Sequence, residues 1–453
     1  MRHAVLVSGL CVLAAVPPVL AVVGTSAARP APHEAAALTG RRAPADAPRT
    51  VEYHGLRVAV PAGWEVHHLD RDPSRCVRYD RRAVYLGRPG PRPDCPARLV
   101  GRTEAVHIQP ERVRPAGHGR ASRTVVHGDG LATLTIPPTV DHEARLTVPE
   151  AGVTITGVYG TDPAGLQRIL RDIRLNLTAN LKPHPNADPH PNADATVRPR
   201  AASTRDIPHD TPFPPEDSAA APVLARPWVR GKGFDTCTAP SLAAMRAWRP
   251  SFKVTNIYIG GAARGCAQPN LTEGWVREVR DMGYRITPTY VGLQAPCGSR
   301  PQRFTAKNAA SQGAKAAVDA ARKARSLGIP EGAPIYYDME AYRSKNKPGC
   351  RAAVLRFVDN WVRRLKAKGY EPCLYSSVTS GIRDVGRADG ISRPVGVWFA
   401  NWDGRAKVYG DPSIPDDWWR PHRRIKQYRG GHKERHGGVT LNIDSNIVDG
   451  RVY

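Results

Sequence analysis

The chain has 453 residues and a formal net charge of +25, and 41% of its residues are hydrophobic. That length allows two or three domains with sizeable cores, which excludes a wholly disordered protein. The charge indicates a polyanionic partner, such as teichoic acid, anionic lipid or nucleic acid, or only the Arg bias of a GC-rich genome. Zinc-finger spacing and aromatic-interleaved basic helices are absent from the sequence, so no specific nucleic-acid partner is predicted.

The N-terminus resembles a secretory signal peptide over residues 1–28. A short positive start precedes an apolar run from Ala4 to Val23, and small residues follow at Thr25–Ala28. An uncleaved anchor helix is the alternative, which Pro17-Pro18 disfavours by breaking the helix. We therefore predict export by signal cleavage and no stable membrane span afterwards. Residues 29–49 are rich in Ala and Pro and are predicted to be disordered.

Residues 50–177 are predicted to form a small α+β domain of unknown role. Val51–Val60 alternates at strand period, and Asp162–Ile173 has the pattern of a short amphipathic helix. Further strand-like runs are Arg78–Leu86, Arg123–Val126, Leu131–Ile136 and Val153–Tyr159. Because no catalytic pattern occurs here, a wall-binding or auxiliary role is the hypothesis for this domain.

Residues 178–227 are predicted to be a Pro/Ala/His-rich linker. They contain a tandem repeat of the sequence His-Pro-Asn-Ala-Asp. This composition cannot bury much apolar surface, and its prolines favour an extended spacer.

Cysteine usage agrees with export. Cys76 and Cys95 fall in the same small domain and are predicted to pair. Four more cysteines allow three pairings that the sequence does not separate: Cys237, Cys266, Cys297 and Cys350. Cys373 lies within a predicted strand and is expected to be a buried free thiol. Zinc is the competing explanation, but no C-x-x-C or H-x-x-x-H spacing supports a metal site.

From residue 228 to residue 453, strand-like runs alternate with helical runs. The predicted strands are 233–235, 256–261, 285–291, 335–338, 372–376, 396–400, 424–428 and 440–444. The predicted helices are 272–282, 305–327 and 352–368. Eight such strands predict an α/β fold of the (β/α)8 (TIM barrel) type with reduced helices late in the chain. A doubly wound open sheet is the rival, but the glycine-rich phosphate loop typical of it is absent from the sequence.

The fourth predicted strand ends in a pair of acids, Asp338 and Glu340. Residues two apart on a strand point to the same face, with Cα atoms about 6–7 Å apart. Two neighbouring acids repel each other, so the pKa of one should rise while the other stays low. This division suits a general acid and a charge stabiliser that share a site. A solvated strand face is the alternative, against which the apolar run Pro334–Tyr337 argues.

Other acids and several aromatic residues are predicted at the same end of the barrel. In such barrels the chemistry gathers at the C-terminal ends of the strands. The candidate substrate-binding residues are Asp235, Tyr258, Tyr290, Tyr342, Tyr375, Trp398, Asn401, Trp402, Gln427 and Asp444. Aromatic faces that stack on sugar rings, together with acids that bind hydroxyl groups, predict a carbohydrate site.

The sequence from Gly233 onward resembles a known family. It looks like the glycoside hydrolase-like domain of exported Gram-positive bacterial proteins, which is similar to the family 25 glycoside hydrolases (lysozymes that cut peptidoglycan). The matching segments are Gly233–Asp235, Asp338–Glu340, Tyr375-Ser376, Trp398–Ala400, Gln427-Tyr428 and Ile443-Asp444.

The resemblance implies a role for each acid. Glu340 would be the general acid and Asp338 its partner carboxylate, while Asp235 and Asp444 would bind substrate and tune the pair. The loop Gln294–Gln302 departs from the lysozyme pattern and is expected to reshape the groove.

The leading hypothesis is a secreted, muramidase-type glycosidase that acts on peptidoglycan or a related wall polysaccharide. The alternative is a non-catalytic wall-polysaccharide binder that keeps the groove. A phosphodiesterase or nuclease is disfavoured, because His422, His432 and His436 are expected on an exposed basic loop. No cofactor or metal is implied, and a monomer is expected. Glu340 should lie at the floor of an open cleft. A Glu340 clamped by an arginine, or buried beneath a loop that no sugar chain could pass, would leave a carbohydrate-cutting role without physical support.

Overall fold

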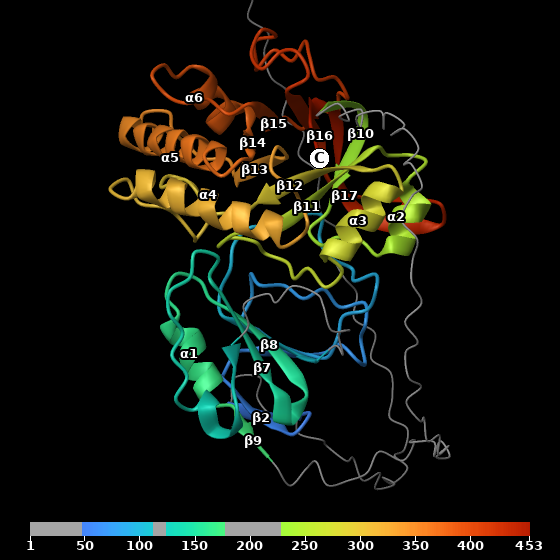
Figure 1. The fold of residues 1–453 in the computed structure, drawn as a ribbon, viewed down its shortest axis with the longest axis vertical. Coiled ribbons are helices and arrows are strands. Elements are labelled where there is room, and N and C mark those ends of the chain that lie inside the picture. Colours follow the sequence, from blue (N-terminus) through green and yellow to red (C-terminus); the bar gives the residue numbers. More distant parts are fainter. Residues whose placement is uncertain (1–47, 112–123, 177–227) are drawn as a thin grey trace, which may run out of the picture. The chain divides into compact units, whose positions relative to one another are not determined.

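The computed structural model describes residues 48–111, 124–176 and 228–453 (Figure 1). The predicted signal peptide, the predicted linker and nearly all of the predicted disordered segment 29–49 lie outside the described residues. Pro48 and Arg49 are the exceptions, and Arg49 begins the first strand. We call residues 48–111 and 124–176 the N-terminal region, and residues 228–453 the barrel region.

The N-terminal region begins with a hairpin where the sequence predicted one strand. Strands β1 (Arg49–Tyr53) and β2 (Leu56–Val60) pair antiparallel, and β9 (Arg174–Leu175) pairs with β2. The turn uses left-handed backbone at His54 and Gly55, with φ of 49° and 75°. Because the alternation continues through this tight turn, the period of the run did not reveal the reversal of the chain.

A six-stranded sheet forms most of this region. Its order is β3 (Glu65–His68), β4 (Ala83–Leu86), β5 (Ala105–Pro110), β8 (Val153–Val158), β7 (Glu143–Val148) and β6 (Thr124–Val125). Short 3-10 helices lie at Gly128–Leu131 and Pro149–Ala151, and helix α1 (Ala164–Arg171) follows β8. The predicted strand Leu131–Ile136 is wrong. The backbone amide of Ile136 donates to the Gln167 side chain, which replaces a strand partner.

In the barrel region, eight strands close into a barrel in chain order. They are β10 (Trp228–Asp235), β11 (Val254–Gly260), β12 (Arg285–Tyr290), β13 (Pro334–Met339), β14 (Glu371–Ser377), β15 (Gly396–Ala400), β16 (Arg424–His436) and β17 (Val439–Arg451). Each overlaps a predicted strand. Strand β17 runs antiparallel to both β16 and β10. The structure is therefore a mixed α/β barrel, and the (β/α)8 assignment is not confirmed.

Few helices cover this barrel, and most of them lie in its first half. They are α2 (Leu242–Trp248), α3 (Glu273–Asp281), α4 (Ala309–Arg325), α5 (Pro348–Lys366), a π turn (Val378–Ile382) and α6 (Arg383–Gly386). Helix α2 was not predicted from the sequence. Helices α4 and α5 lie side by side (Figure 1). Gly313 permits this approach, because a Cβ there would lie 2.3 Å from the Phe357 carbonyl oxygen.

Side chains fill the barrel and determine which residues reach its mouth. Tyr336 and Trp398 point inward and pack with Cys373 and Tyr375. Tyr337, which follows Tyr336 in the sequence, points outward and packs on Trp361 of α5. Since side chains alternate along a strand, Asp338 falls on the same inner face as Tyr336.

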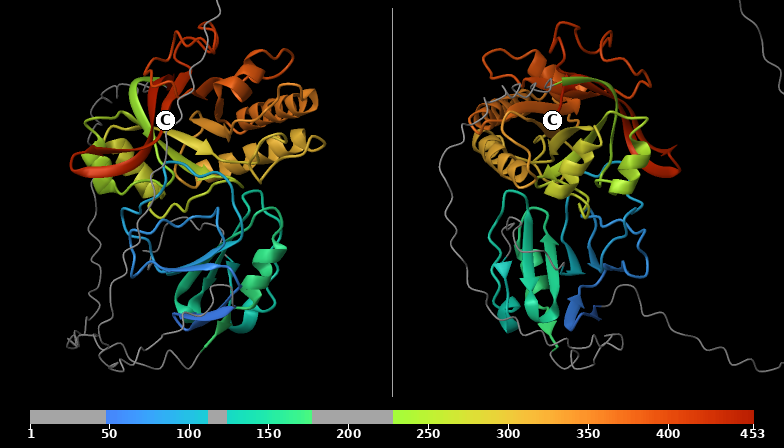
Figure 2. Two further views of the ribbon diagram at one scale, coloured as in Figure 1. Left: turned by 180° about the vertical axis from the view of Figure 1, so that it is seen from behind. Right: turned by 45° about the vertical axis from the view of Figure 1, so that its right-hand side comes forward.

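Strands β16 and β17 continue beyond the barrel as a hairpin, visible in Figure 2. Gly437 and Gly438 form its turn with φ of 53° and 78°. The predicted exposed basic loop around His432 and His436 is therefore wrong. Both histidines lie on β16, and both contact Glu434.

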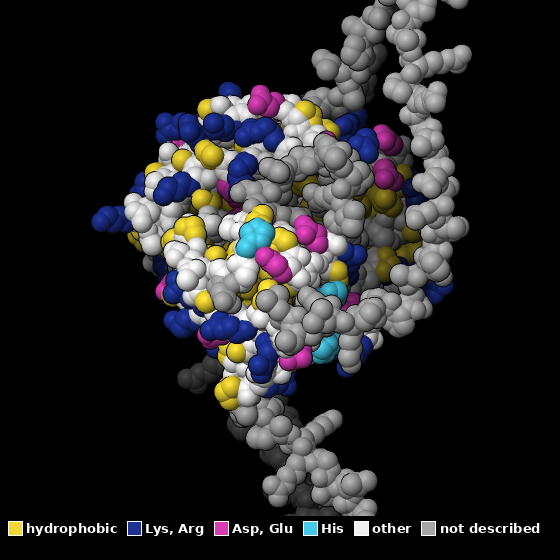
Figure 3. Space-filling view, turned by 60° about the horizontal axis from the view of Figure 1, so that its bottom comes forward, with side chains coloured by type: hydrophobic (Ala, Val, Ile, Leu, Met, Phe, Trp, Pro, Cys, Tyr) yellow, Lys and Arg dark blue, Asp and Glu magenta, His cyan; other side chains and the backbone are white. Residues whose placement is uncertain are grey.

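The described residues belong to one compact unit that spans residues 45–453. None of their helices has the length and hydropathy needed to cross a bilayer. Lys and Arg side chains are scattered over the face seen in Figure 3, with Asp and Glu among them. On that face the positive charge is therefore dispersed rather than gathered into a single patch.

Candidate active site at the barrel mouth

Four carboxyl groups meet at the end of the barrel where its seven parallel strands terminate, and the antiparallel strand β17 brings Asp444 opposite Asp235 there. Asp235 ends β10, Asp338 lies near the end of β13, Glu340 follows that strand, and Asp444 lies on β17. All four are buried, with exposed fractions of 0% for Asp235, 1% for Asp338, 7% for Glu340 and 2% for Asp444. The strand ends thus bring together acids that are far apart in the sequence.

Gln427 of β16 connects one pair of these acids to the aromatic residues. Its amide nitrogen donates to Asp235 at 3.1 Å and to Asp444 at 3.1 Å. Its amide oxygen accepts from the Tyr375 hydroxyl at 3.0 Å and from the Trp402 indole at 2.9 Å. One buried amide therefore fixes two acids and two aromatic side chains.

The pair Asp235 and Asp444 is arranged to retain protons. Burial raises the pKa of Asp235 to about 6, although the amides of Asn446 and Gln427 donate to it. Burial, followed by the charge of Asp235, raises the pKa of Asp444 to about 8. Desolvation and a like charge both disfavour ionisation, so Asp444 is the better proton donor of the two near neutral pH.

The pair Asp338 and Glu340 is divided in the opposite sense to the expected one. Burial, followed by the charge of Glu340, raises the pKa of Asp338 well above its usual range. Burial also favours protonation of Glu340, but the charges of Arg98 and Arg300 outweigh it and lower its pKa. These pKa directions leave the proton on Asp338 and the negative charge on Glu340. The resemblance implied the reverse, with Glu340 as the protonated acid.

Two arginines clamp Glu340. Arg300 donates to one carboxylate oxygen at 2.7 Å, and Arg98 lies 3.4 Å from the other. Arg300 belongs to the loop Gln294–Gln302, whereas Arg98 belongs to the N-terminal region. Within the described part of the chain, Arg98 therefore covers Glu340, and the expected open cleft above Glu340 is not found there.

Arg98 also contacts the aromatic side chains of the mouth. It donates to the Tyr375 hydroxyl, and its guanidinium lies over the rings of Tyr375 and Trp402 at 5.7 Å and 5.5 Å from their centroids. Its side chain is only 16% exposed. These are the surfaces on which a sugar would be expected to stack.

Gln294 holds the acid pair from beneath. Its side-chain oxygen accepts from the Glu340 amide at 2.7 Å, and its nitrogen donates to the Asp338 carbonyl oxygen at 2.8 Å. The loop that begins with Gln294 is anchored by the Cys297–Cys350 disulfide. The predicted insertion thus reshapes the mouth by positioning the pair and by supplying Arg300.

The remaining predicted residues divide into two groups. Tyr258 and Trp398 point inward, and the Trp398 indole donates to Asn446 at 2.8 Å. Three residues are not brought to the acids: Tyr290, Tyr342 and Asn401. Their polar groups bind Asp319 of α4, Asp384 of α6 and Asp411 instead. Tyr290 and Tyr342 were expected to line the groove, but each side chain points toward the helices.

Four residues of the site were not predicted: Arg98, Arg300, Gln294 and Asn446. Asn446 donates to Asp235 at 2.6 Å. It lies two residues after Asp444 on one strand, so alternation along β17 was a usable signal. Arg98 had no such signal, since 277 residues separate it from Tyr375.

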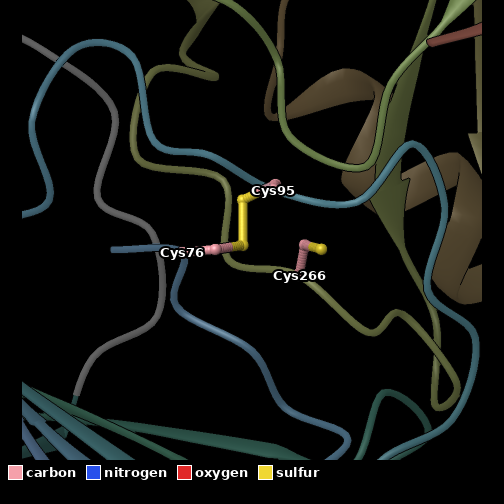
Figure 4. A group of neighbouring side chains, drawn as sticks. All are labelled: Cys76, Cys95 and Cys266. Atoms are coloured by element: carbon pink, nitrogen blue, oxygen red, sulfur yellow. A yellow bond between two sulfur atoms is a disulfide. The ribbon is translucent and has the colours of Figure 1, made fainter. Parts of the chain in front are cut away.

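The cysteines pair in one of the three ways that the sequence left open. The disulfides are Cys76–Cys95, Cys237–Cys266 and Cys297–Cys350, and Cys373 is a buried free thiol as predicted. The sulfur atoms of Cys76, Cys95 and Cys266 lie within 4.8 Å of one another (Figure 4). All three are in disulfides, so none is a thiolate available to a metal ion.

Comparison with known proteins identifies a related domain family. Residues 246–448 match the family model of the Rv2525c-like, glycoside hydrolase-like domain. This match confirms the resemblance predicted from the sequence and covers most of the barrel region. No curated protein matches the chain.

Several solved structures resemble about half of the chain. An uncharacterized protein of B. stearothermophilus shares 19% identity at a TM-score of 0.33, over 49% of this chain and 99% of its own. The Tat-secreted protein Rv2525c of Mycobacterium tuberculosis, in complex with HEPES, shares 18% identity at a TM-score of 0.33. The match covers 48% of this chain and 93% of that protein. A family 25 glycosyl hydrolase from Bacillus anthracis shares 16% identity at a TM-score of 0.32. The match covers 50% of this chain and 92% of that protein.

Proposed function

We propose that the barrel region is a glycosidase, of the (β/α)8 type with its late helices lost, that cleaves peptidoglycan or a related cell-wall polysaccharide. The observation that supports this most is the meeting of Asp338 and Glu340 with Asp235 and Asp444 in one aromatic-lined mouth. The glycoside hydrolase-like family match covers the same strands. A pure binding protein gains little from four buried carboxyl groups, since each costs free energy to desolvate.

In the proposed reaction, the proton that Asp338 holds in this structure passes to Glu340, which protonates the glycosidic oxygen, and the ionised Asp338 then stabilises the positive charge that develops at the anomeric carbon. Such cleavage passes through an oxocarbenium-like transition state. Asp235 and Asp444, held by Gln427, would bind sugar hydroxyls and tune the pair. The two carboxyl groups interact electrostatically, since the charge of Glu340 raises the pKa of Asp338. The pair therefore acts as one coupled unit that shares a proton.

We further propose that the protein works outside the cell, as a monomer. Three disulfides support an oxidising compartment. The net charge of +25 suits a wall that carries anionic polymers.

Release of reducing ends from purified Gram-positive cell walls tests the proposed activity. Glu340→Gln keeps the shape of the side chain but removes the group that would protonate the leaving oxygen. Asp338→Asn removes the partner carboxyl, which supplies the proton and then carries the negative charge. We expect each variant to lose at least two orders of magnitude in rate relative to its parent chain. Asp389→Asn is the matched control, because its side chain is fully exposed and its ion pair with Arg393 lies at the surface. Equal rates in the parent and in Glu340→Gln would refute the proposal.

A non-catalytic wall-polysaccharide binder is the second candidate. The clamp on Glu340 favours it, since an ionised carboxylate between two arginines donates no proton. This candidate expects saturable, salt-sensitive binding to purified walls without release of reducing ends, even after long incubation. The rates of parent and Glu340→Gln, measured beside their wall affinities, separate the two functions.

A further inference from the structure

We propose that the N-terminal region is a built-in inhibitor of the barrel, and that its segment Cys95–Arg102 occupies the carbohydrate site. We call this the blocking segment. The inference rests on the proposed function, because it assigns a regulation to the same mouth. It gives a role to the N-terminal region, in which the sequence showed no chemistry.

The backbone of the blocking segment is bound by the barrel along its length. The Cys95 carbonyl oxygen accepts from the Asn442 side chain, and the Gly101 amide donates to the Ala263 carbonyl oxygen at 2.7 Å. At Arg102, the Gln302 side chain accepts from the backbone amide and donates to the carbonyl oxygen, each at 2.8 Å. Such paired main-chain contacts resemble the seat of a bound peptide more than an accidental surface contact.

The barrel is shaped to admit the blocking segment. Gly265 faces Leu99, and a Cβ at Gly265 would lie 2.6 Å from the Leu99 Cβ and 2.7 Å from its carbonyl oxygen. Only a residue without a side chain permits this approach. Val100 packs in a buried cluster with Ala263, Val291 and the candidate sugar-stacking residue Tyr258. The segment thus covers one wall of the mouth while Arg98 covers its floor.

Two disulfides lie at the entry to this seat. Cys95, the first residue of the blocking segment, is tied to Cys76, and this bridge lies beside Cys266 (Figure 4). Cys266 in turn forms a disulfide with Cys237 of the barrel, and all of these cysteines pack in one cluster. Arg78 forms an isolated β-bridge to Cys266 nearby. The cross-link shortens the reach of the unbound segment, which lowers the entropy lost when Arg98 is seated.

Arg98 blocks the site in two ways at once. It occupies the space between Glu340, Tyr375 and Trp402, so a sugar ring cannot stack there. Its charge also lowers the pKa of Glu340, which removes the proton that cleavage needs. Withdrawal of Arg98 would both open the mouth and raise the pKa of Glu340, leaving Arg300 as its cationic partner.

Binding of a soluble N-acetylglucosamine tetramer to the full chain tests the inhibition directly. Isothermal titration calorimetry gives the Kd, and release of reducing ends from purified walls gives the rate. Arg98→Ala should bind the tetramer at least tenfold more tightly than the parent chain and should cleave walls at least tenfold faster. Arg98→Lys keeps a charge but loses the planar contacts, so an intermediate affinity is expected.

Arg92→Ala is the matched control, because it removes one arginine just before the blocking segment at an exposed position. Its affinity and rate should equal those of the parent. Gly265→Ala is a second route to the same result, since the added methyl group must push Leu99 away. It keeps Arg98 intact, so tighter tetramer binding in this variant would assign the effect to the seat of the segment. Thermal unfolding of each variant establishes that it is folded.

The outcomes separate this inference from the proposed function. Equal or weaker tetramer binding by folded Arg98→Ala and Gly265→Ala overturns the inference, and weaker binding by Arg98→Ala makes Arg98 part of the sugar site. Tighter binding without any release of reducing ends supports the inhibition and refutes the glycosidase. Tighter binding with faster release supports both.

Discussion

Arg98 and Arg102 lie four residues apart on one segment, yet their surroundings differ. Arg102 donates to the carbonyl oxygens of Arg264 and Asp141, at 2.7 Å and 2.5 Å, and pairs with Glu143 at 3.3 Å. Its side chain is fully buried. Arg98 donates to no backbone carbonyl among the described residues and instead contacts Glu340, Tyr375 and Trp402.

This difference separates an anchor from a blocking group. Backbone carbonyls are always present, so the partners of Arg102 are those of a permanent structural contact. The partners of Arg98 are ionisable and aromatic side chains of the kind that bind sugars, and other molecules can compete for them. The contacts of Arg102 should therefore determine stability, whereas the contacts of Arg98 at the mouth should determine binding and activity.

Removal of Glu143 should give the largest loss of stability. Glu143 is buried and pairs with Arg102, Arg264 and Arg145, so Glu143→Ala leaves buried charge without its counter-ion. The free energy of unfolding in urea should fall by about 3–5 kcal/mol. Glu52→Ala is the control, because its ion pair with Arg57 is exposed and should matter little. A loss at Glu143 as small as that at Glu52 would contradict the anchor.

The two arginines should differ when each is replaced by Ala. Arg102→Ala removes several buried, charge-assisted hydrogen bonds and should cost about 3 kcal/mol of unfolding free energy. Arg98→Ala should cost clearly less, because Arg300 still pairs with Glu340 and the acids of the mouth can take up protons. Urea unfolding of both variants at pH 6 measures the difference. Equal losses would make Arg98 a structural residue like Arg102.

The pH dependence of stability should identify Asp444. Its pKa of about 8 lies above the unfolded value near 4, so the folded state binds the proton more tightly. The resulting stabilisation is fully present below about pH 4 and is lost as the pH rises to about 8. Asp444→Asn should flatten the fall of Tm between pH 5 and pH 8. Asp389 is fully exposed, so Asp389→Asn should keep the dependence of Tm on pH seen in the parent chain. An unchanged dependence in Asp444→Asn would show that the pKa of Asp444 is not raised to about 8.

The smallest expected effect is the coupling of Arg98 to Trp402. Trp402 is 56% exposed, and the guanidinium lies 5.5 Å from its ring centroid. A double-mutant cycle with Arg98→Ala and Trp402→Ala should give a coupling of about 0.5–1 kcal/mol in unfolding free energy. Strictly additive losses would show that the ring does not help to hold Arg98. A second double-mutant cycle, on Arg249 and Tyr284, provides a reference, because the Arg249 guanidinium lies 5.4 Å from the centroid of the Tyr284 ring.

Much of the barrel could be predicted because its signals are local. All eight predicted strands overlap observed ones, and the predicted start of α3 is right, since the Thr272 side chain accepts from the Trp275 amide. The apolar pattern of β17 did not predict the direction of the strand, because this pattern is the same whether the neighbouring strand is parallel or antiparallel. The paired glycines Gly437 and Gly438 were the available sign of a hairpin in place of a helix.

The candidate site divides along the same line. Asp338 and Glu340 are two residues apart, so their shared face followed from strand geometry. Tyr290 was predicted to line the groove, but the alternation of side chains along β12 places it on the outer side. Its hydroxyl donates to Asp319 there. Which carboxyl of the pair holds the proton depends on Arg98 and Arg300, and neither is near the pair in sequence.

By itself the sequence determined the barrel strands, the acids at their ends and the free thiol of Cys373, because strand period, strand-end position and burial pattern are properties of neighbouring residues. Only the tertiary structure decided that the mouth is closed and that Glu340 is ionised. A segment of the N-terminal region meets the barrel through Gly265 and Gln302, and the charge of Arg98 acts on Glu340 across 3.4 Å of space and 242 positions of chain. Electrostatic energy depends on distance in space, and no pattern along the chain encodes it.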